Sequence, residues 1–262
     1  MEIEFNDLYK YISLFFCCFT RLGAAIMTMP VFGTKMLPNR VRLILVLALT
    51  AICIPSCDRQ PQIEILTLNT LIIIIQQFII GIAIGMVLQL VFQVFVLLGE
   101  IIAMQSSLSF AILNDPNTNS TVPIVGQLYI ILVSYLFLAF DGHLYFFKLL
   151  FGSFQVVPIN AQGLDFASYY QIVHLTSWMF ANAIKIAMPA ITALLMVNIA
   201  FGVMTKAAPQ LNIFGIGFPI TMVIGICIIW LCISTIDSHF NRMFEYGMDF
   251  LNTEILGSKR LG

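Results

Sequence analysis

The chain contains one very long apolar stretch, LTLNTLIIIIQQFIIGIAIGMVLQLVFQVFVLLGEIIAMQSSLSFAIL (Leu66–Leu113), with no proline and with Glu100 as its one charged residue. As a single α-helix with a rise of ~1.5 Å per residue it would be about 70 Å long, more than twice the ~30 Å hydrocarbon core of a bilayer. The stretch must therefore bend back, for which Gly81–Gly85 is a candidate position, or project well beyond the membrane.

The rest of the chain shares this apolar character. It is 60% hydrophobic and 10% charged, whereas soluble domains carry about 25% charged residues. With so few charges, the surface has to be covered by lipid, detergent or partner protein, which indicates an integral or membrane-associated protein. The apolar runs lack the alternation that is typical of β-barrel strands, so we predict an all-α fold. The net charge of −1 gives no indication of a nucleic-acid partner.

We predict a single domain over residues 1–262, with an amphipathic helical segment at about 237–257. Breaks rich in proline, glycine or polar residues separate the apolar runs before it. In the final segment, apolar residues recur every three or four positions, as they do on one face of a helix. These residues are Phe240, Met243, Phe244, Met248, Leu251 and Ile255. Such a helix either packs on the protein or lies at a membrane interface.

The most basic loop of the chain contains Lys35, Arg40 and Arg42. The next loop also contains acidic residues and has no basic excess. Because cytoplasmic loops of membrane proteins carry an excess of Lys and Arg, we expect the first loop to face the cytoplasm.

Nothing in the sequence predicts catalysis. His143, His174 and His239 lie far apart, and none has a further metal ligand three or four residues later. Motifs for phosphate binding, zinc proteases and the nucleophile elbow are absent. The six cysteines form no metal-binding spacing and resemble small buried apolar residues. We therefore predict a protein that is not an enzyme, with no catalytic residue, no metal site and no cofactor.

Some polar residues inside the apolar runs are candidates for function, because a charge in lipid costs ~2.5–3.5 kcal/mol and usually faces protein or water. The charged ones are Arg21, Glu100, Lys148 and Lys185. A polar stripe recurs at spacings of four and seven on one helix face: Gln89, Gln93, Glu100 and Ser107. The stripe either faces a pore or another subunit, or it forms a hydrogen-bonding seam inside the chain. A third option is that Glu100 carries a transported proton.

Five local patterns occur in order along nearly the whole chain. They are TRLGAAIMTMPVFG (Thr20–Gly33) followed by Pro38 and Arg42; GEIIAMQSSLSFAILNDP (Gly99–Pro116); DGH (Asp141–His143); SF (Ser153–Phe154) with Pro158; and KAAPQLNIFGIGFPITMVIG (Lys206–Gly225). The last is the most specific, and it contains Lys206, Pro209 and Asn212. Together the five patterns resemble the FliR family of flagellar biosynthetic proteins in the type III export apparatus.

The resemblance implies a structural and gating subunit of the flagellar export gate, which forms part of the channel that secretes unfolded flagellar proteins. It implies helical hairpins that stack within a multi-subunit assembly, partly above the bilayer plane, in the bacterial inner membrane at the flagellar basal body. The implied partners are FliP-like and FliQ-like subunits, FlhB, FlhA, the exported flagellar proteins and membrane lipid.

In this family, the loop corresponding to Ser106–Thr121 projects into the channel as a plug. The resemblance places six residues of this chain in that plug: Phe110, Ile112, Leu113, Asn114, Asp115 and Pro116. An apolar constriction can hold back water and ions, and a loop on rigid helices can move. Relatives often have more aromatic residues before the Asp-Pro step than this chain, which offers only Phe110. From composition alone, the same stretch is an ordinary polar turn between two helices.

Two other functions stay open. The chain could be a secondary transporter or ion channel that uses the intramembrane charges of Arg21, Glu100 and Lys185. It could also be the injectisome counterpart of the same gate subunit, although the PQLNIF wording (Pro209–Phe214) is more similar to the flagellar branch.

Overall fold

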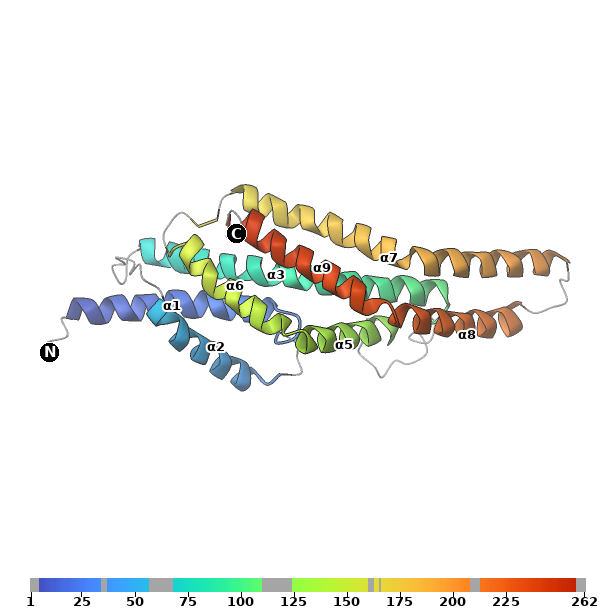
Figure 1. Cartoon of the computed structure of the whole chain (residues 1–262), viewed down its shortest axis with the longest axis horizontal. Coiled ribbons are helices and arrows are strands. Elements are labelled where there is room, and N and C mark those ends of the chain that lie inside the picture. The colour runs from blue at the N-terminus through green and yellow to red at the C-terminus, as the bar shows by residue number, and fades with distance from the viewer. Residues whose placement is uncertain are drawn as a thin grey trace. The chain divides into compact units, whose positions relative to one another are not determined.

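The described part of the chain is built from helices alone, which confirms the predicted all-α class. The structure is a computed structural model that describes residues 5–33, 37–56, 68–109, 124–159, 163–164, 166–207 and 213–257. Its elements, shown in Figure 1, are α1 (Phe5–Thr28), α2 (Asn39–Cys53), the short 3₁₀ helix η1 (Ile54–Ser56), α3 (Leu68–Gln105), α5 (Ile124–Ala139), α6 (Gly142–Val156), α7 (Phe166–Ala207), α8 (Ile213–Ile233), α9 (Ile236–Phe250) and the π-helical turn η2 (Leu251–Ile255).

Several helix ends follow from local chemistry. Pro38 precedes the first residue of α2, where a missing amide hydrogen does no harm. Asp141 precedes α6 with a φ of 54°, in the left-handed region that aspartate tolerates better than most residues. Ser107 follows α3 with a φ of 62°, which ends that helix. Pro158 follows α6 and cannot continue it.

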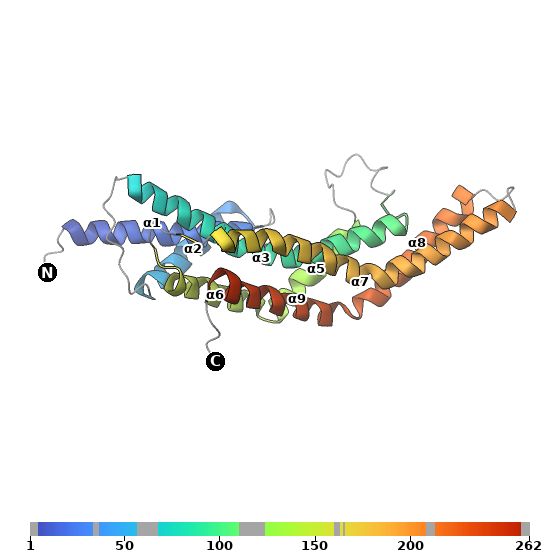
Figure 2. The same cartoon turned by 90° about the horizontal axis from the view of Figure 1, so that it is seen from above.

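Within the long apolar stretch, Leu68–Gln105 form one uninterrupted helix, α3, with 38 residues and a length of about 57 Å. The helix does not bend back at Gly81–Gly85. Of the two alternatives, the structure therefore has the continuous helix that is longer than the bilayer core. These glycines instead allow α1 to approach. A Cβ atom at Gly81 would collide with the carbonyl oxygen of Arg21 and lie 2.8 Å from Cβ of Ala24. Figures 1 and 2 show α1 and the first part of α3 side by side.

The chain packs as two compact units. Unit 1 comprises Met1–Leu90, Phe140–Leu175 and Phe244–Gly262, and unit 2 comprises Val91–Ala139 and Thr176–Met243. The helices α3, α7 and α9 contribute residues to both units. The prediction of one domain over 1–262 stays a prediction.

The core of unit 1 is formed by the inward faces of α1, α3 and α6 together with η2. Small and medium side chains dominate on α1, and large ones dominate on α6. The fully or almost fully buried residues include Cys17, Leu22, Ala25, Ile26, Ile80, Ile84, Phe146, Leu150 and Leu251. At the edge of this core, the ring of Phe32 lies 6.0 Å from that of Phe147.

Unit 2 is held by four buried phenylalanines from three helices. Phe92 of α3 contacts Phe137 of α5 and Phe240 of α9, with ring centroids 5.5 Å and 6.2 Å apart and edge-to-face geometry. Phe95 of α3 lies 6.1 Å from the same Phe240 ring. Each such pair contributes ~0.5–1.5 kcal/mol beyond the burial of its area.

The amphipathic tail packs on the protein, the first of its two alternatives. Its apolar positions Phe240, Met243, Met248, Leu251 and Ile255 are buried. The tail begins at a 58° bend between α8 and α9, and it ends in the π-helical turn η2.

Within the described ranges, three helices are long and apolar enough to cross a membrane, or up to five if each bent pair counts as one span. The chain is therefore a membrane protein. The longest of the described helices, α7, has 42 residues, yet only 17% of the residues in its apolar stretch are buried within the chain. The last part of α7 runs beside α8 in both views (Figures 1 and 2), and the remaining apolar surface of α7 needs cover from outside the chain.

Candidate functional site

Arg21 is the most deeply buried charged residue of the described chain, and it lies within unit 1. Its side chain is fully buried. Nε donates a hydrogen bond to Oε1 of Gln77 on α3 at 2.7 Å. Nη1 donates to the carbonyl oxygen of Ser153 at 3.1 Å, and Nη2 donates to that of Val157 at 2.9 Å. We call Arg21, Gln77, Ser153, Phe154 and Val157 the Arg21 centre.

The Arg21 centre closes the C-terminal end of α6. The last carbonyl groups of a helix have no partner within it, and they carry a partial negative charge that favours a cation. From α1, Arg21 donates to the carbonyl of Val157, the residue after the last of α6, and to that of Ser153, which also accepts from the Val157 amide at 2.9 Å. Nη1 also lies 3.3 Å from the Ser153 hydroxyl. The guanidinium stacks over the ring of Phe154 at 4.3 Å. One side chain thus joins α1, α3 and α6.

The sequence predicts that Arg21 is a charge inside an apolar run, but it does not reveal the partners of this side chain. Gln77 belongs to a pair of glutamines that directly follows four consecutive isoleucines, so the sequence does show a polar site within this apolar run. Ser153 and Phe154 had entered only through the SF pattern. The structure shows that this pattern and the TRLG pattern, which contains Arg21, are in contact although about 130 residues separate them.

In unit 2, two glycines allow helices to touch where α3 ends. A Cβ atom at Gly99 would lie 2.7 Å from Cα of Gly126 on α5. A Cβ atom at Gly225 on α8 would collide with Cβ of Ser106, whose hydroxyl donates to the carbonyl oxygen of Ile102 at 2.7 Å. Gly225 ends the KAAPQLNIFGIGFPITMVIG pattern, so this pattern fixes the end of α3 through a backbone-to-side-chain contact.

The predicted polar stripe is placed only in part on α3. Gln89, Gln93 and Glu100 lie on this helix and are half-buried, and no described residue donates a hydrogen bond to Glu100. Ser107 lies beyond the helix end at Gln105 and has a left-handed backbone, so it does not continue the helical face. The role of the stripe stays a prediction.

The remaining candidate residues lie apart from the Arg21 centre. Lys148 on α6, Lys185 on α7 and Lys206 at the end of α7 are exposed. The plug residues lie outside the described part of the chain, as do two residues of the last pattern: Phe110, Ile112, Leu113, Asn114, Asp115, Pro116, Pro209 and Asn212.

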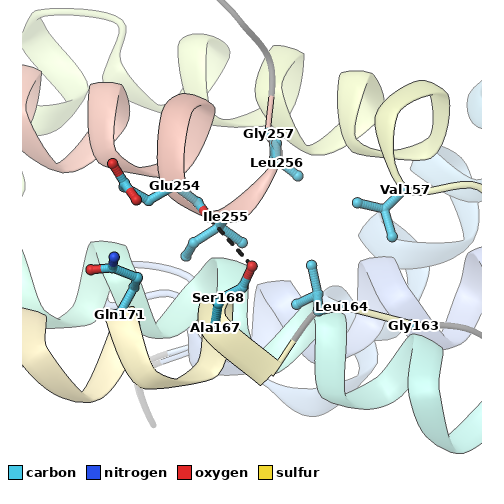
Figure 3. Close-up of a pocket in the computed structure, with 10 residues that line it drawn as sticks. All are labelled: Val157, Gly163, Leu164, Ala167, Ser168, Gln171, Glu254, Ile255, Leu256 and Gly257. Carbon is cyan, nitrogen blue, oxygen red and sulfur yellow. Dashed lines mark hydrogen bonds between the residues drawn. The ribbon is translucent and has the colours of Figure 1, made fainter.

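A cavity of about 790 Å³ lies in unit 1 between the start of α7 and η2. Figure 3 shows Ser168 donating a hydrogen bond to the carbonyl oxygen of Glu254, at 3.3 Å. Glu254 is the one ionisable side chain among the described residues that line this cavity. A hydroxyl held by a backbone carbonyl beside one carboxylate provides no nucleophile–base pair. In the described ranges, no three His, Cys, Asp or Glu residues gather as metal ligands.

Comparison with known proteins gives a consistent result over almost the whole chain. The family model described as bacterial export proteins, family 1, matches residues 12–247. Proteins named flagellar biosynthetic protein FliR are 34% identical in Pectobacterium carotovorum subsp. carotovorum, over 95% of this chain and 96% of that protein, and 33% identical in Escherichia coli (strain K12), over 94% of each. The protein of that name in Bacillus subtilis (strain 168) is 24% identical over 92% of this chain and 93% of its own length.

Replacement of Arg21 tests whether the Arg21 centre holds three helices together. Arg21→Lys keeps the charge but cannot serve the acceptors on α3 and α6 at once, and each buried hydrogen-bonding group left without a partner costs ~1–3 kcal/mol. We expect the free energy of unfolding in detergent to fall by roughly 3 kcal/mol. Circular dichroism during denaturant titration measures this change. Lys148→Gln on the exposed side of α6 is the control and should change it by less than about 0.5 kcal/mol. Equal stability of Arg21→Lys and wild type would contradict this role.

The contact between Gly225 and Ser106 can be tested by exchanging the small residues. Gly225→Ala overpacks the contact and should lower the free energy of unfolding by ~1–3 kcal/mol. Adding Ser106→Gly should restore most of this loss, because the nearest remaining atom, Cα of residue 106, lies 3.6 Å from the new methyl group.

Gly202→Ala on α7 is the matched control, since its methyl group would meet nothing within 4 Å. That variant should be neutral or gain up to ~1 kcal/mol from helix propensity. A double variant that is no more stable than Gly225→Ala would rule out the proposed contact.

Proposed function

The chain belongs to the family described as bacterial export proteins, family 1, and we propose that it is a structural and gating subunit of the flagellar type III protein export gate. The observation that carries the proposal is the match over residues 12–247 together with full-length relatives named flagellar biosynthetic protein FliR. The family resemblance stated from the sequence patterns is thereby confirmed. In the proposal, the chain forms part of the channel through which unfolded flagellar proteins leave the cell, in the bacterial inner membrane at the flagellar basal body.

The exposed apolar surface of α7 supports an assembly role. At 42 residues α7 is about 63 Å long, so lipid tails of a ~30 Å core can cover only about half of it. Met196, Ile199 and Val203 are among its exposed side chains, and Val223 and Trp230 are exposed on the neighbouring α8. Partner subunits provide the missing cover, and we propose that these are the FliP-like and FliQ-like subunits, FlhB and FlhA.

The chain supplies structure and gating and has no chemistry of its own in this proposal. Its sequence contains no phosphate-binding motif, so energy for export comes from other components. A secondary transporter would need a path for its solute lined by ionisable groups. Of the three candidates for that path, Arg21 is hydrogen-bonded at the helix end of α6, Lys185 is exposed on the helix surface, and Glu100 is half-buried on α3.

Deletion of the gene separates the export proposal from the transporter alternative. We expect the deletion strain to lose secretion of hook and filament proteins, because the channel is incomplete, and to keep small-solute uptake. Western blots of the culture supernatant and an uptake assay measure the two outcomes, and complementation with the intact gene is the control. Normal hook and filament secretion would sink the proposal. Loss of injectisome substrates in place of flagellar ones would favour the counterpart subunit.

The plug proposal concerns residues 106–121, with Phe110 as the aromatic residue of the seal. Phe110→Gly should make an assembled gate leaky, because removing the ring widens the apolar constriction that excludes water and ions. Planar-bilayer conductance of the co-purified complex measures the leak. Phe166→Gly, at an exposed phenylalanine of α7, is the matched control and should leave the conductance at the wild-type level. Wild-type conductance of Phe110→Gly would show that this loop is not the plug.

A further inference from the structure

The helix α2 presents an apolar face that no described part of the chain covers. Its inward side buries Val46, Thr50 and Cys53, and Val46 packs over Gly23 of α1. We define the α2 outer face as the exposed large apolar side chains of this helix. They are Val41, Leu43, Ile44, Leu47 and Ile52, of which Ile44 is 65% and Ile52 63% exposed.

The charges of α2 all lie at one end and have one sign. Between Pro38 and Pro55 the only charged residues are Arg40 and Arg42, both in the first turn of the helix. Cations at a helix N-terminus are unfavourable for the helix itself, so helix stability does not explain them. Arg42 donates from Nε to the carbonyl oxygen of Phe32 at 3.0 Å, whereas Arg40 is exposed beside the α2 outer face. A partner for this surface has to be apolar and anionic at once.

The dimensions of α2 favour a lipid surface over a protein partner. With 15 residues the helix is about 22 Å long, too short to cross a ~30 Å core. Polar and charged residues flank it in the sequence, with Lys35 before it and Asp58 and Arg59 after it, so both ends favour the water-facing side of a membrane. One face of such a helix covers about 220 Å², well below the ~800 Å² that each partner of a standard protein interface buries.

We propose that α2 lies in the interfacial layer of a leaflet that contains anionic lipids. The α2 outer face is embedded among the upper parts of the acyl chains, and Arg40 extends to the headgroup phosphates, as long basic side chains do at such interfaces. Because α2 packs on α1, its position in the interfacial layer would also set how deeply α1 is placed in the membrane. This assignment concerns lipid contact alone and does not depend on the export function.

The test places a tryptophan reporter on the α2 outer face of the full-length chain. Ile44→Trp is introduced with Trp178→Phe and Trp230→Phe, and Ile52→Trp serves as a second reporter if the first variant does not fold. The protein is reconstituted into phosphatidylcholine vesicles with 30% phosphatidylglycerol. Acyl-chain bromine, a contact quencher of tryptophan, is carried either by the phosphatidylglycerol or by an equal share of the phosphatidylcholine.

We expect brominated phosphatidylglycerol to quench the reporter at least about twofold more than brominated phosphatidylcholine. Arg40→Glu should abolish that preference. Lys185→Glu is the matched control, because it changes the charge equally on an exposed position of α7, and it should keep the preference. Absence of quenching, equal quenching by both lipids, or an equal effect of the two charge reversals would overturn the proposal.

A second measurement asks whether protein covers α2 in the cell. The photo-cross-linker p-benzoylphenylalanine is placed at position 44 of the full-length chain in living cells, with the same cross-linker at position 223 on α8 for comparison. We expect no protein adduct from position 44. A protein adduct there would overturn the lipid assignment, whereas the result at position 223 bears only on partner subunits and leaves it unaffected.

Discussion

The packing of unit 1 depends on how a single arginine side chain is accommodated among apolar helices. An isolated charge in such surroundings is strongly unfavourable, so its donors must be engaged in several directions at once. The planar guanidinium of Arg21 meets this need with a glutamine amide on α3 and two carbonyl oxygens at the end of α6. The carbonyl of Val157, the residue after the last of α6, receives a donor from Arg21, and the carbonyl of Ser153, which already accepts from the Val157 amide, gains a second one. The position of α2 follows in turn, since that helix packs on α1.

The same residue also fixes how closely α1 and α3 approach. The side chain of Arg21 bonds Gln77, and its carbonyl oxygen lies against Gly81, which is four residues further along the same face of α3. Between apolar helices in lipid there is little hydrophobic driving force, so close backbone contact and hydrogen bonds have to supply the attraction. The hydrogen bond from Arg21 to Gln77 and the close backbone contact at Gly81 lie one helical turn apart, so both kinds of attraction act where α1 and α3 cross.

Composition predicted the helical membrane class because it depends only on how much apolar surface must avoid water. The sequence could not decide between a bend and a continuous helix at Gly81–Gly85, since glycine permits either outcome. In the structure these glycines stay helical and receive the backbone of α1, with the carbonyl of Arg21 against Gly81. That contact depends on tertiary packing, which the sequence does not show. Helical periodicity likewise extends the polar stripe from Gln89, Gln93 and Glu100 to Ser107, whereas the structure has the first three on α3 and Ser107 beyond the end of that helix. Periodicity also could not reveal that Gln77 faces an arginine from another helix.

The Arg21 centre has a consequence for the order of biogenesis. Ser153 and Val157 lie 132 and 136 residues after Arg21 in the chain. At a synthesis rate of ~5–20 residues per second, α1 emerges roughly 7 to 26 s before the carbonyls that its arginine binds. During that interval, release of α1 into lipid would carry the ~2.5–3.5 kcal/mol cost of a mid-helix arginine. The hydrogen bonds that join α1 to the end of α6 can therefore form only after α6 has been made, although α1 itself is the first helix to be synthesised.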